Sequence, residues 1–341
     1  MTLDQRIQLL VLLGKYIQQD TPERERALLH TEQYNRWLTQ TNSLKSLQAI
    51  ATEFLTEEKL TLLTQQYNMP AVQANPKKVG LILAGNLPAV GFHDLLCTFL
   101  SGHIALVKYS DKDKHLIPYM VDYLTELEPQ VADYIQTVER LSDFDAVIAT
   151  GSDNSALYFE QYFGKYPNII RKNRNAVAIL DGSETEEELL ALGSDIFTYY
   201  GMGCRSVSKL YVPEGYDLVN LMRVLDDYAP DLKHNKYINN YDYNRSIYLL
   251  NRVPHLANDC VMLLENESLV SRIAVVHYEY YTNIEELANQ LNEQTEAIQC
   301  IATKNKMATK VATVGLGQTQ CPTITDYADG VDTLAFLLEL A

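Results

Sequence analysis

Apolar residues recur at helical spacing through about the first 75 residues. Leu47, Ile50 and Phe54 show this pattern, which ends at the proline-containing stretch MPAVQANP (69–76). The earlier run LLVLLG (9–14) is flanked by polar and acidic residues and is too short to span a bilayer, so it predicts an amphipathic helix. We therefore expect a helical segment ahead of the first sheet and no membrane span.

Beyond residue 77, short apolar runs alternate with amphipathic stretches. Strands are predicted at 79–85, 104–110 and 143–152, and helices at 88–102, 114–127 and 155–167. Uninterrupted apolar strands separated by helices indicate a buried parallel sheet. Ligands of such sheets bind beyond the carboxyl ends of the strands, so the loops of interest are GNLP (85–88), KYS (108–110) and TGS (150–152).

A second α/β unit is predicted to begin near Ala176. AVAIL (176–180) is a predicted strand, and the helix after it is expected to start with a capping box formed by Ser183 and Glu186. The same alternation continues with strands at 208–213, 270–278 and 297–304 and a helix at 283–292. The tyrosine-rich stretch from 239 to 251 is polar and gives no clear element. The fold class is therefore α/β with about two domains.

Composition narrows the classes of function. The formal net charge of −16 over 341 residues argues against a nucleic-acid partner, because such binding needs a basic surface. No CxxC pair and no HExxH motif occurs, so no metal site is expected. The chain shows no secretory leader and has five cysteines, an odd number. We expect reduced thiols and a cytoplasmic protein.

Cys204 is the candidate nucleophile. It lies in GMGCRSVSKLYVP, where Gly201 and Gly203 provide no bulk to cover a thiol, while Arg205 and Lys209 add positive charge that favours the reactive thiolate. The alternative is a helix that ends at a glycine, followed by a cysteine without a role. No histidine or aspartate lies nearby in the sequence. A protease-like arrangement would need a distant partner such as His93 or His103, each of which also fits a polar residue at a helix end.

Six motifs in order carry a resemblance to a known family: GNLP, GHIALVKYS, ATGS, AVAILDGSE, GMGCRSVSKLYVP and ESLVSRIAVVHY. This order is similar to that of the aldehyde dehydrogenase superfamily. Within it, the chain most resembles the acyl-CoA reductases related to the fatty acid reductase of bacterial bioluminescence operons, from about Lys77 to the carboxyl end. The resemblance implies an aldehyde dehydrogenase-like fold with two Rossmann-like three-layer α/β/α domains after the helical segment. There is no GxGxxG fingerprint, and GLGQ (315–318) is not one, but this superfamily's dinucleotide fold lacks it.

The resemblance also implies a domain organisation. Residues 1–175 would form the helical segment and the nicotinamide dinucleotide-binding domain, and residues 176–310 the catalytic domain. Residues 311–341 would be a C-terminal segment that returns to the cofactor domain or to an oligomer interface. A homo-oligomer, either a dimer or a tetramer, is expected, although the chain shows no clear counterpart of the long β-hairpin with which many members oligomerise.

The resemblance assigns the catalytic roles to two residues. Cys204 would be the nucleophile that accepts the acyl group. Asn86 would donate its side-chain amide, together with the backbone N–H of Cys204, to the oxyanion. From the residues alone, a turn residue before Pro88 is the preferred interpretation of Asn86.

The resemblance assigns cofactor binding to five residues. Lys108, with Ser110 in the same loop, would reach the adenosine ribose and any 2′-phosphate, and Gly151 and Ser152 would lie near the pyrophosphate. Glu267 would hold the nicotinamide ribose, although Leu269, Val270 and Ser271 replace the Phe, Gly and Pro of the family motif. Alternatives remain open at this point: Lys108 as a surface lysine, Ser152 as a helix N-cap, and Glu267 as a solvated acidic residue.

One departure from the superfamily bears on the reaction. Oxidising aldehyde dehydrogenases carry a glutamate base before the strand that begins near 176, whereas this chain has Arg171, Lys172 and Arg174 and no carboxylate there. Without that base the thioester is left for thiol exchange or hydride reduction. The basic residues could meet phosphates of coenzyme A or NADP, or simply form a solvated loop.

The expected activity is NADP-dependent reduction of an acyl-CoA or acyl-carrier thioester to an aldehyde, with NAD as a possible cofactor and an acyl-donor protein as a possible partner. The alternatives are an aldehyde or semialdehyde dehydrogenase working in the oxidising direction, and a catalytically quiet subunit that binds the cofactor or an acyl carrier.

Overall fold

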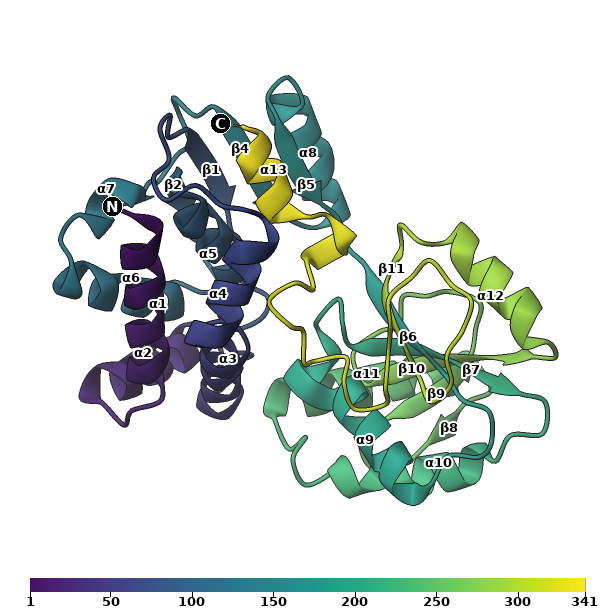
Figure 1. Ribbon diagram of the computed structural model, residues 1–341. Helices are drawn as coiled ribbons and strands as arrows, with labels where there is room; N and C mark the ends of the chain where they lie inside the picture. The colour runs from purple at the N-terminus through teal and green to yellow at the C-terminus, as the bar shows by residue number, and fades with distance from the viewer. Residues whose placement is uncertain (341) are drawn as a thin grey trace. The chain divides into compact units, whose positions relative to one another are not determined.

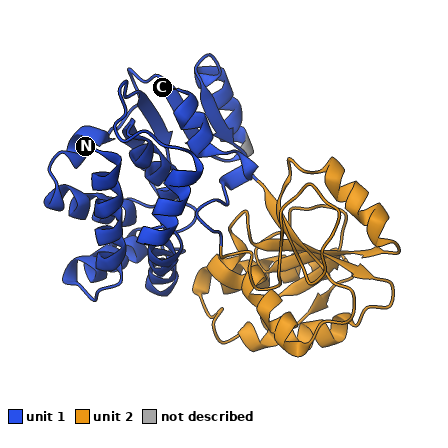
Figure 2. Cartoon of the chain, viewed as in Figure 1, with its two compact units in different colours: residues 1–173, 322–341 blue, residues 174–321 orange. Residues whose placement is uncertain are grey.

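The chain forms two compact units in the computed structural model, which describes residues 1–340 apart from the side chain of Asp153. Figure 2 shows the first unit, residues 1–173 with the chain from 322 onward, and the second, residues 174–321. The predicted boundary at 310 falls inside the second unit. The reason is that residues 313–314 form a strand on the sheet of that unit, so the chain leaves the unit only after Cys321.

Four helices form the predicted N-terminal segment: α1 (Leu3–Ile17), α2 (Pro22–Tyr34), α3 (Gln40–Glu53) and α4 (Glu57–Gln66). Each begins after a threonine whose hydroxyl accepts a hydrogen bond from a backbone N–H of the first turn, which satisfies one of the donors left open at a helix start. Leu10, Leu13 and Ile17 of α1 are buried, and α1 packs against α3, α5 and α6. The segment is therefore part of the core of the first unit.

The sheet of the first unit is entirely parallel, with the order β3-β2-β1-β4-β5. Figure 1 labels β1, β2, β4 and β5 of this sheet. Its strands are β1 (Lys78–Ile82), β2 (Ile104–Lys108), β3 (Ile135–Thr137), β4 (Ala146–Thr150) and β5 (Asn168–Arg171), and its helices are α5 (Phe92–Ser101), α6 (Leu116–Leu127), α7 (Val131–Tyr134) and α8 (Asp153–Phe163). The three central strands were predicted. The edge strands β3 and β5 were not, because they are short and carry polar residues.

The chain from 322 onward completes the first unit. It contains η3 (Ala328–Gly330) and α13 (Thr333–Glu339), and α13 packs against α5. Buried His103 connects this segment to the start of β1. Its Nε2 donates to the carbonyl oxygen of Leu337 at 2.8 Å, and its Nδ1 accepts from the backbone N–H of Lys77 at 3.0 Å. Burial lowers the pKa of His103. His103 is therefore a structural residue.

The second unit has a seven-stranded sheet with the order β12-β11-β6-β7-β10-β9-β8, in which only the β8–β9 pair is antiparallel. The strands are β6 (Asn175–Ile179), β7 (Val207–Pro213), β8 (Leu256–Ala257), β9 (Met262–Glu265), β10 (Val275–Tyr281), β11 (Ile298–Thr303) and β12 (Thr313–Val314). The helices are α9 (Glu186–Phe197), η1 (Thr198–Gly201), α10 (Leu218–Leu225), η2 (Asp226–Tyr228), α11 (Asn235–Leu250) and α12 (Ile284–Glu293).

Two local predictions in this unit were wrong, and one helix was not predicted. The capping box of α9 is formed by Thr185 and Glu188, two residues later than predicted. The helix starts later because residues 181–184 form a turn, in which the Glu184 carboxylate accepts hydrogen bonds from the N–H groups of Asp181 and Gly182. β10 starts at Val275 rather than 270, because residues 268–274 form a loop. The tyrosine-rich stretch is helix α11, whose buried stripe consists of tyrosines and an asparagine instead of aliphatic residues.

Within residues 1–340, none of the helices combines the length and the apolar character needed to cross a bilayer.

Candidate active site

The loops after β1, β2 and β4 meet at one edge of the first sheet. Ile82, the last residue of β1, pairs with Lys108 of β2 on one side and with Ala149 of β4 on the other. The carboxyl ends of the three strands are therefore level, and residues 85–88, 108–110 and 150–152 follow them at the same edge. The strand order reverses between β1 and β4, which is where parallel sheets bind ligands.

Gly85 brings the first two loops into direct contact. A Cβ atom at this position would lie 2.5 Å from Ser110 Oγ, so only glycine allows the approach. The carboxylate of buried Asp113 accepts a hydrogen bond from the backbone N–H of Ala89 at 2.7 Å, which ties the ends of the two loops together. Burial raises the pKa of Asp113. Asn86 is exposed between these anchors.

Gly151 and Ser152 lead into α8. The Ser152 hydroxyl is the N-cap of this helix and accepts a hydrogen bond from the backbone N–H of Ser155 at 3.4 Å. A Cβ atom on Gly151 would lie 2.7 Å from the Cβ of Ser155, so the turn into the helix is tight. A helix N-terminus reached through a tight glycine turn at this edge suits a phosphate group.

Replacing Gly85 with alanine is expected to destabilise the first unit by about 1–3 kcal/mol, because the new methyl group overlaps Ser110. Urea denaturation measures the loss. Gly315→Ala is the control, since the nearest atom to a Cβ there is 3.7 Å away. Adding Ser110→Gly to Gly85→Ala should restore most of the stability. Equal stability of Gly85→Ala and the native chain would contradict the contact.

Cys204 lies in the turn between η1 and β7. The residues before it, Tyr199, Tyr200 and Gly201, have positive φ angles of 55°, 60° and 71°. For residues other than glycine this conformation costs about 1–2 kcal/mol each. The buried Tyr200 ring packs against the rings of His234 and Tyr237, with centroids 5.0 and 5.9 Å away, which helps to hold the segment.

The turn itself is closed by hydrogen bonds on both sides of the thiol. The N–H of Ser206 donates to the carbonyl oxygen of Gly203 at 3.0 Å, and the N–H of Gly203 donates to Ser206 Oγ at 3.2 Å. Cys204 is half-buried at the tip of this turn. The arrangement presents a thiol on a backbone whose conformation is fixed.

The expected contribution of Lys209 to the charge near Cys204 was wrong. Lys209 is fully buried, and its Nζ donates to the Glu279 carboxylate and to the carbonyl oxygen of Glu267, both at 2.6 Å. Its charge is therefore paired inside the unit. Arg205 is half-buried and contacts the carbonyl oxygen of Thr319 at 3.5 Å.

Glu267 is exposed in the loop after β9, and the backbone of this loop is anchored by strand side chains. Besides Lys209, Ser208 donates to the carbonyl oxygen of Leu269 at 2.7 Å and His277 Nδ1 donates to that of Ser268 at 2.9 Å. Sequence reasoning missed these anchors. The available signal was a set of polar residues inside the apolar strands β7 and β10.

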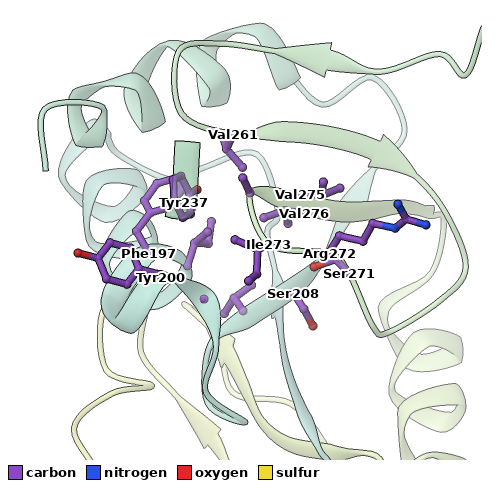
Figure 3. A pocket seen from close by; sticks show the side chains of 14 residues that line it. Phe197, Tyr200, Ser208, Tyr237, Val261, Ser271, Arg272, Ile273, Val275 and Val276 are labelled. Atoms are coloured by element: carbon purple, nitrogen blue, oxygen red, sulfur yellow. The ribbon is translucent and has the colours of Figure 1, made fainter. Parts of the chain in front are cut away.

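Two hollows occur in the second unit. Figure 3 shows the smaller one, lined by Phe197 of α9, Tyr200 of η1, Tyr237 of α11 and residues of β7 and β10. Its volume of about 20 Å³ has room for one water molecule, so it cannot hold an acyl chain. The larger, of about 440 Å³, is lined by Val253, Pro254, Leu264, Glu265, Asn266, Glu267 and Glu279. Its size is in the range of ligand pockets, and its carboxylates favour hydroxyl groups over phosphates.

The basic residues at 171–174 do not form a phosphate-binding cluster. Arg171 is buried in an ion pair with Asp94 and also donates to Thr333 Oγ1 at 2.8 Å. Arg174 donates to the carbonyl oxygen of Thr295 at 3.0 Å. Lys172 pairs with Glu160 at the surface. Arg171 and Arg174 therefore support the fold, because they donate hydrogen bonds to groups far away in the sequence.

Neither histidine considered as a partner for the thiol is suited to act as a base. His103 has both ring nitrogens in hydrogen bonds to the backbone. His93 Nε2 donates to the carbonyl oxygen of Ile324 at 2.8 Å, and its ring packs against Phe54 and Tyr327. Over residues 1–340, no group of three or more His, Cys, Asp or Glu side chains is placed to hold a metal ion.

Solved structures similar to this chain share its fold at low sequence identity. An oxidoreductase from Marinobacter aquaeolei has a TM-score of 0.70 and 11% identity, with 95% of this chain and 79% of that chain covered. An aldehyde dehydrogenase from Bacillus cereus, solved with NAD+, has 0.68 and 12%, covering 97% and 80%. Betaine aldehyde dehydrogenase from Staphylococcus aureus, also solved with NAD+, has 0.67 and 11%, covering 93% and 75%. These matches confirm the predicted aldehyde dehydrogenase-like α/β fold.

Sequence comparison identifies the family. No curated protein sequence matches the chain. The family model described as acyl-CoA reductase (LuxC) matches residues 14–233, which is more than half of the chain and includes Asn86, Lys108 and Cys204. The expected resemblance is thereby confirmed, and the chain belongs to the acyl-CoA reductase (LuxC) family.

Proposed function

We propose that this protein uses a reduced nicotinamide cofactor to reduce an acyl thioester to the aldehyde, through an acyl-enzyme thioester on Cys204. The substrate is either an acyl-CoA or the thioester of an acyl carrier. The observation that carries the proposal is the half-buried Cys204 thiol at the tip of a closed turn, in a chain of the acyl-CoA reductase family. A thiolate is the side chain best suited to exchange with a thioester, because the bond formed and the bond broken are alike.

Cys204 acts twice in the proposed reaction. Its thiolate adds to the acyl carbonyl carbon, and the donor leaves as a thiolate when the carbon–sulfur bond to it breaks, so the acyl group is now on Cys204. The nicotinamide supplies the hydride that converts this thioester to the aldehyde. Cys204 leaves as a thiolate at the end, which returns the enzyme to its starting form.

Asn86 stabilises the negative charge that develops on the acyl oxygen during acyl transfer. Its amide N–H and the backbone N–H of Cys204 are the proposed donors. The exposed position of Asn86, between loop ends fixed by Gly85 and Asp113, supports this role, because a donor on a fixed loop needs no reorganisation during the reaction.

Two sets of residues are proposed to bind the cofactor. Lys108, Ser110, Gly151 and Ser152 would hold its adenosine and pyrophosphate, which is supported by the tight glycine approaches at the switch edge of the first sheet. Glu267 would hold the nicotinamide ribose, which is supported by the acidic hollow beside it. Lys108 favours NADP, because a lysine can bind the 2′-phosphate, and the NAD+ complexes among similar structures keep NAD as the alternative.

Reduction is preferred over hydrolysis because no base is proposed near the thioester. At the place where oxidising relatives carry their glutamate, Arg171 and Arg174 are engaged with Asp94 and with backbone carbonyls. Residues 171–175 supply no carboxylate to accept a proton from water, so the acyl-enzyme is proposed to persist until a thiol or a hydride reaches it.

The test of the proposed function is oxidation of NADPH or NADH that depends on acyl-CoA, with the aldehyde product trapped by a hydrazine. We expect one molecule of aldehyde to form for each molecule of cofactor oxidised. Formation of NAD(P)H from aldehyde without added thiol would instead identify an oxidising dehydrogenase. No turnover with any acyl-CoA or acyl carrier, from folded and reduced protein, would identify a catalytically quiet subunit.

Replacing Asn86 with alanine is expected to slow acyl transfer to Cys204 by about 10²–10³-fold, the usual effect of losing one oxyanion donor. A rapid-quench measurement of acyl-enzyme formation gives the rate. Asn75→Ala, an exposed asparagine of the same unit outside these loops, is the control and should react at the native rate. An unchanged rate in Asn86→Ala would remove this residue from the oxyanion site.

A further inference from the structure

We propose that Asp195 is a positioning residue for Cys204 and acts through the loop of residues 317–320. The inference rests on the proposed function only in taking Cys204 as the nucleophile. Asp195 belongs to α9, more than 100 residues before that loop, and its side chain does not contact solvent. No role was expected for it from the sequence.

Both carboxylate oxygens of Asp195 bind the 317–320 loop. Oδ2 accepts a hydrogen bond from the backbone N–H of Gly317 at 2.6 Å. Oδ1 accepts from the backbone N–H and from the hydroxyl of Thr319, at 2.9 and 2.7 Å. Three charge-assisted hydrogen bonds to a fully buried group fix this loop against α9.

The loop in turn holds the turn that carries Cys204. Gln320 Nε2 donates to Ser206 Oγ at 3.3 Å, and the Arg205 guanidinium contacts the carbonyl oxygen of Thr319 at 3.5 Å. The same Ser206 hydroxyl oxygen accepts from the N–H of Gly203. The residues on both sides of Cys204 are therefore connected to Asp195 through Thr319 and Gln320.

The cost of this arrangement favours a positioning role. Burial raises the pKa of Asp195, because the charged carboxylate loses its contact with water. An apolar residue would avoid the cost of burying a charge, but it would leave the N–H groups of Gly317 and Thr319 without this acceptor. A carboxylate does what an apolar side chain cannot, since it sets the direction of three N–H and O–H groups at once. Gly317 has a φ of +81°, and a Cβ there would lie 2.8 Å from Ala191 Cβ, so the loop follows the helix closely.

Thr319→Val removes one hydrogen bond to Asp195 at nearly constant volume, and Gln320→Ala removes the link to Ser206. Both are expected to slow acyl transfer to Cys204 about tenfold in single-turnover measurements, because a displaced nucleophile spends less time in reach of the carbonyl. Thr319→Ser keeps the hydroxyl and should react at nearly the native rate. Gln318→Ala, in the same loop but exposed, is the matched control. Circular dichroism checks that each variant is folded.

Amide hydrogen exchange provides a readout that does not depend on catalysis. In Thr319→Val and Gln320→Ala, exchange at residues 203–206 should rise about fivefold, the factor that one lost hydrogen bond gives, in addition to any change at 315–321. A purely local structural role would raise exchange at 315–321 alone.

The two measurements separate the proposals. Faster exchange at 203–206 in the variants supports the positioning role, even if the native protein accepts no acyl group and the proposed function fails. Native exchange at 203–206, or native rates of acyl transfer in both variants, overturns the positioning role and leaves the proposed function intact. If Thr319→Val does not fold, Gln320→Ala decides the result.

Discussion

Replacing Cys204 with alanine is expected to abolish reduction of acyl thioesters and to leave the fold and cofactor binding nearly unchanged. The reason is that the thiolate is the only proposed nucleophile, while the proposed cofactor contacts come from other residues. The residual rate should fall to that of the reaction without enzyme, since no acyl-enzyme can form. Cofactor oxidation with acyl-CoA measures the rate, and cofactor-dependent quenching of protein fluorescence measures binding.

Cys321→Ala is the matched control for this variant, because Cys321 is the exposed cysteine of the chain and has no proposed role. It should retain the native rate. Turnover by Cys204→Ala at a rate near that of Cys321→Ala would contradict the mechanism. Loss of cofactor binding together with turnover would point to a folding defect, which circular dichroism of the same sample would reveal.

Replacing Arg171 with methionine is expected to destabilise the first unit by about 3–5 kcal/mol. Arg171 and Asp94 have side chains only 4% and 9% exposed, and removing one partner leaves the other charge buried without compensation. Arg171 also bonds Thr333 at the start of α13, so the variant should loosen the C-terminal segment as well. Urea denaturation followed by circular dichroism measures the loss, with the transitions of the two units analysed separately.

Lys172→Met is the control, because Lys172 and Glu160 form a pair that is about half exposed. Such surface pairs contribute about 0–1 kcal/mol. The double variant Asp94→Leu with Arg171→Met should recover much of the stability, since an apolar pair leaves no buried charge. Equal stability of Arg171→Met and Lys172→Met would contradict the assigned role of the buried pair.

The alternation of apolar runs and amphipathic stretches predicted the central strands well, because a parallel strand buried on both faces must be apolar throughout. β1, β2, β4 and β6 follow this rule apart from residues at their ends, whereas β7 also contains Ser208 and Lys209 and β11 contains Gln299. Elements that bury other residue types were missed. Helix α11 buries Tyr237, Tyr241 and Tyr248, whose hydroxyl groups make the stripe look polar in the sequence.

The candidate site was predicted in its loops but not in their supports. Gly85 after β1 marks a close backbone approach and Gly201 before Cys204 marks a positive φ angle, and these signals are local. By contrast, Asp195 meets Thr319 and Lys209 meets Glu279 only when the chain folds. Counting charges therefore misassigned Lys209, Arg171 and Arg174, because a sequence does not show which basic side chain has a buried partner.

The mass of the intact protein shows whether Cys204 carries the acyl group. The native chain is incubated with a series of acyl-CoAs without nicotinamide cofactor, and its mass is then measured and its peptides mapped. We expect a gain in mass equal to one acyl group, located on Cys204 and removed when NADPH or NADH is added. An acyl group found on another residue, or no gain with any acyl-CoA or acyl carrier from folded and reduced protein, would contradict it.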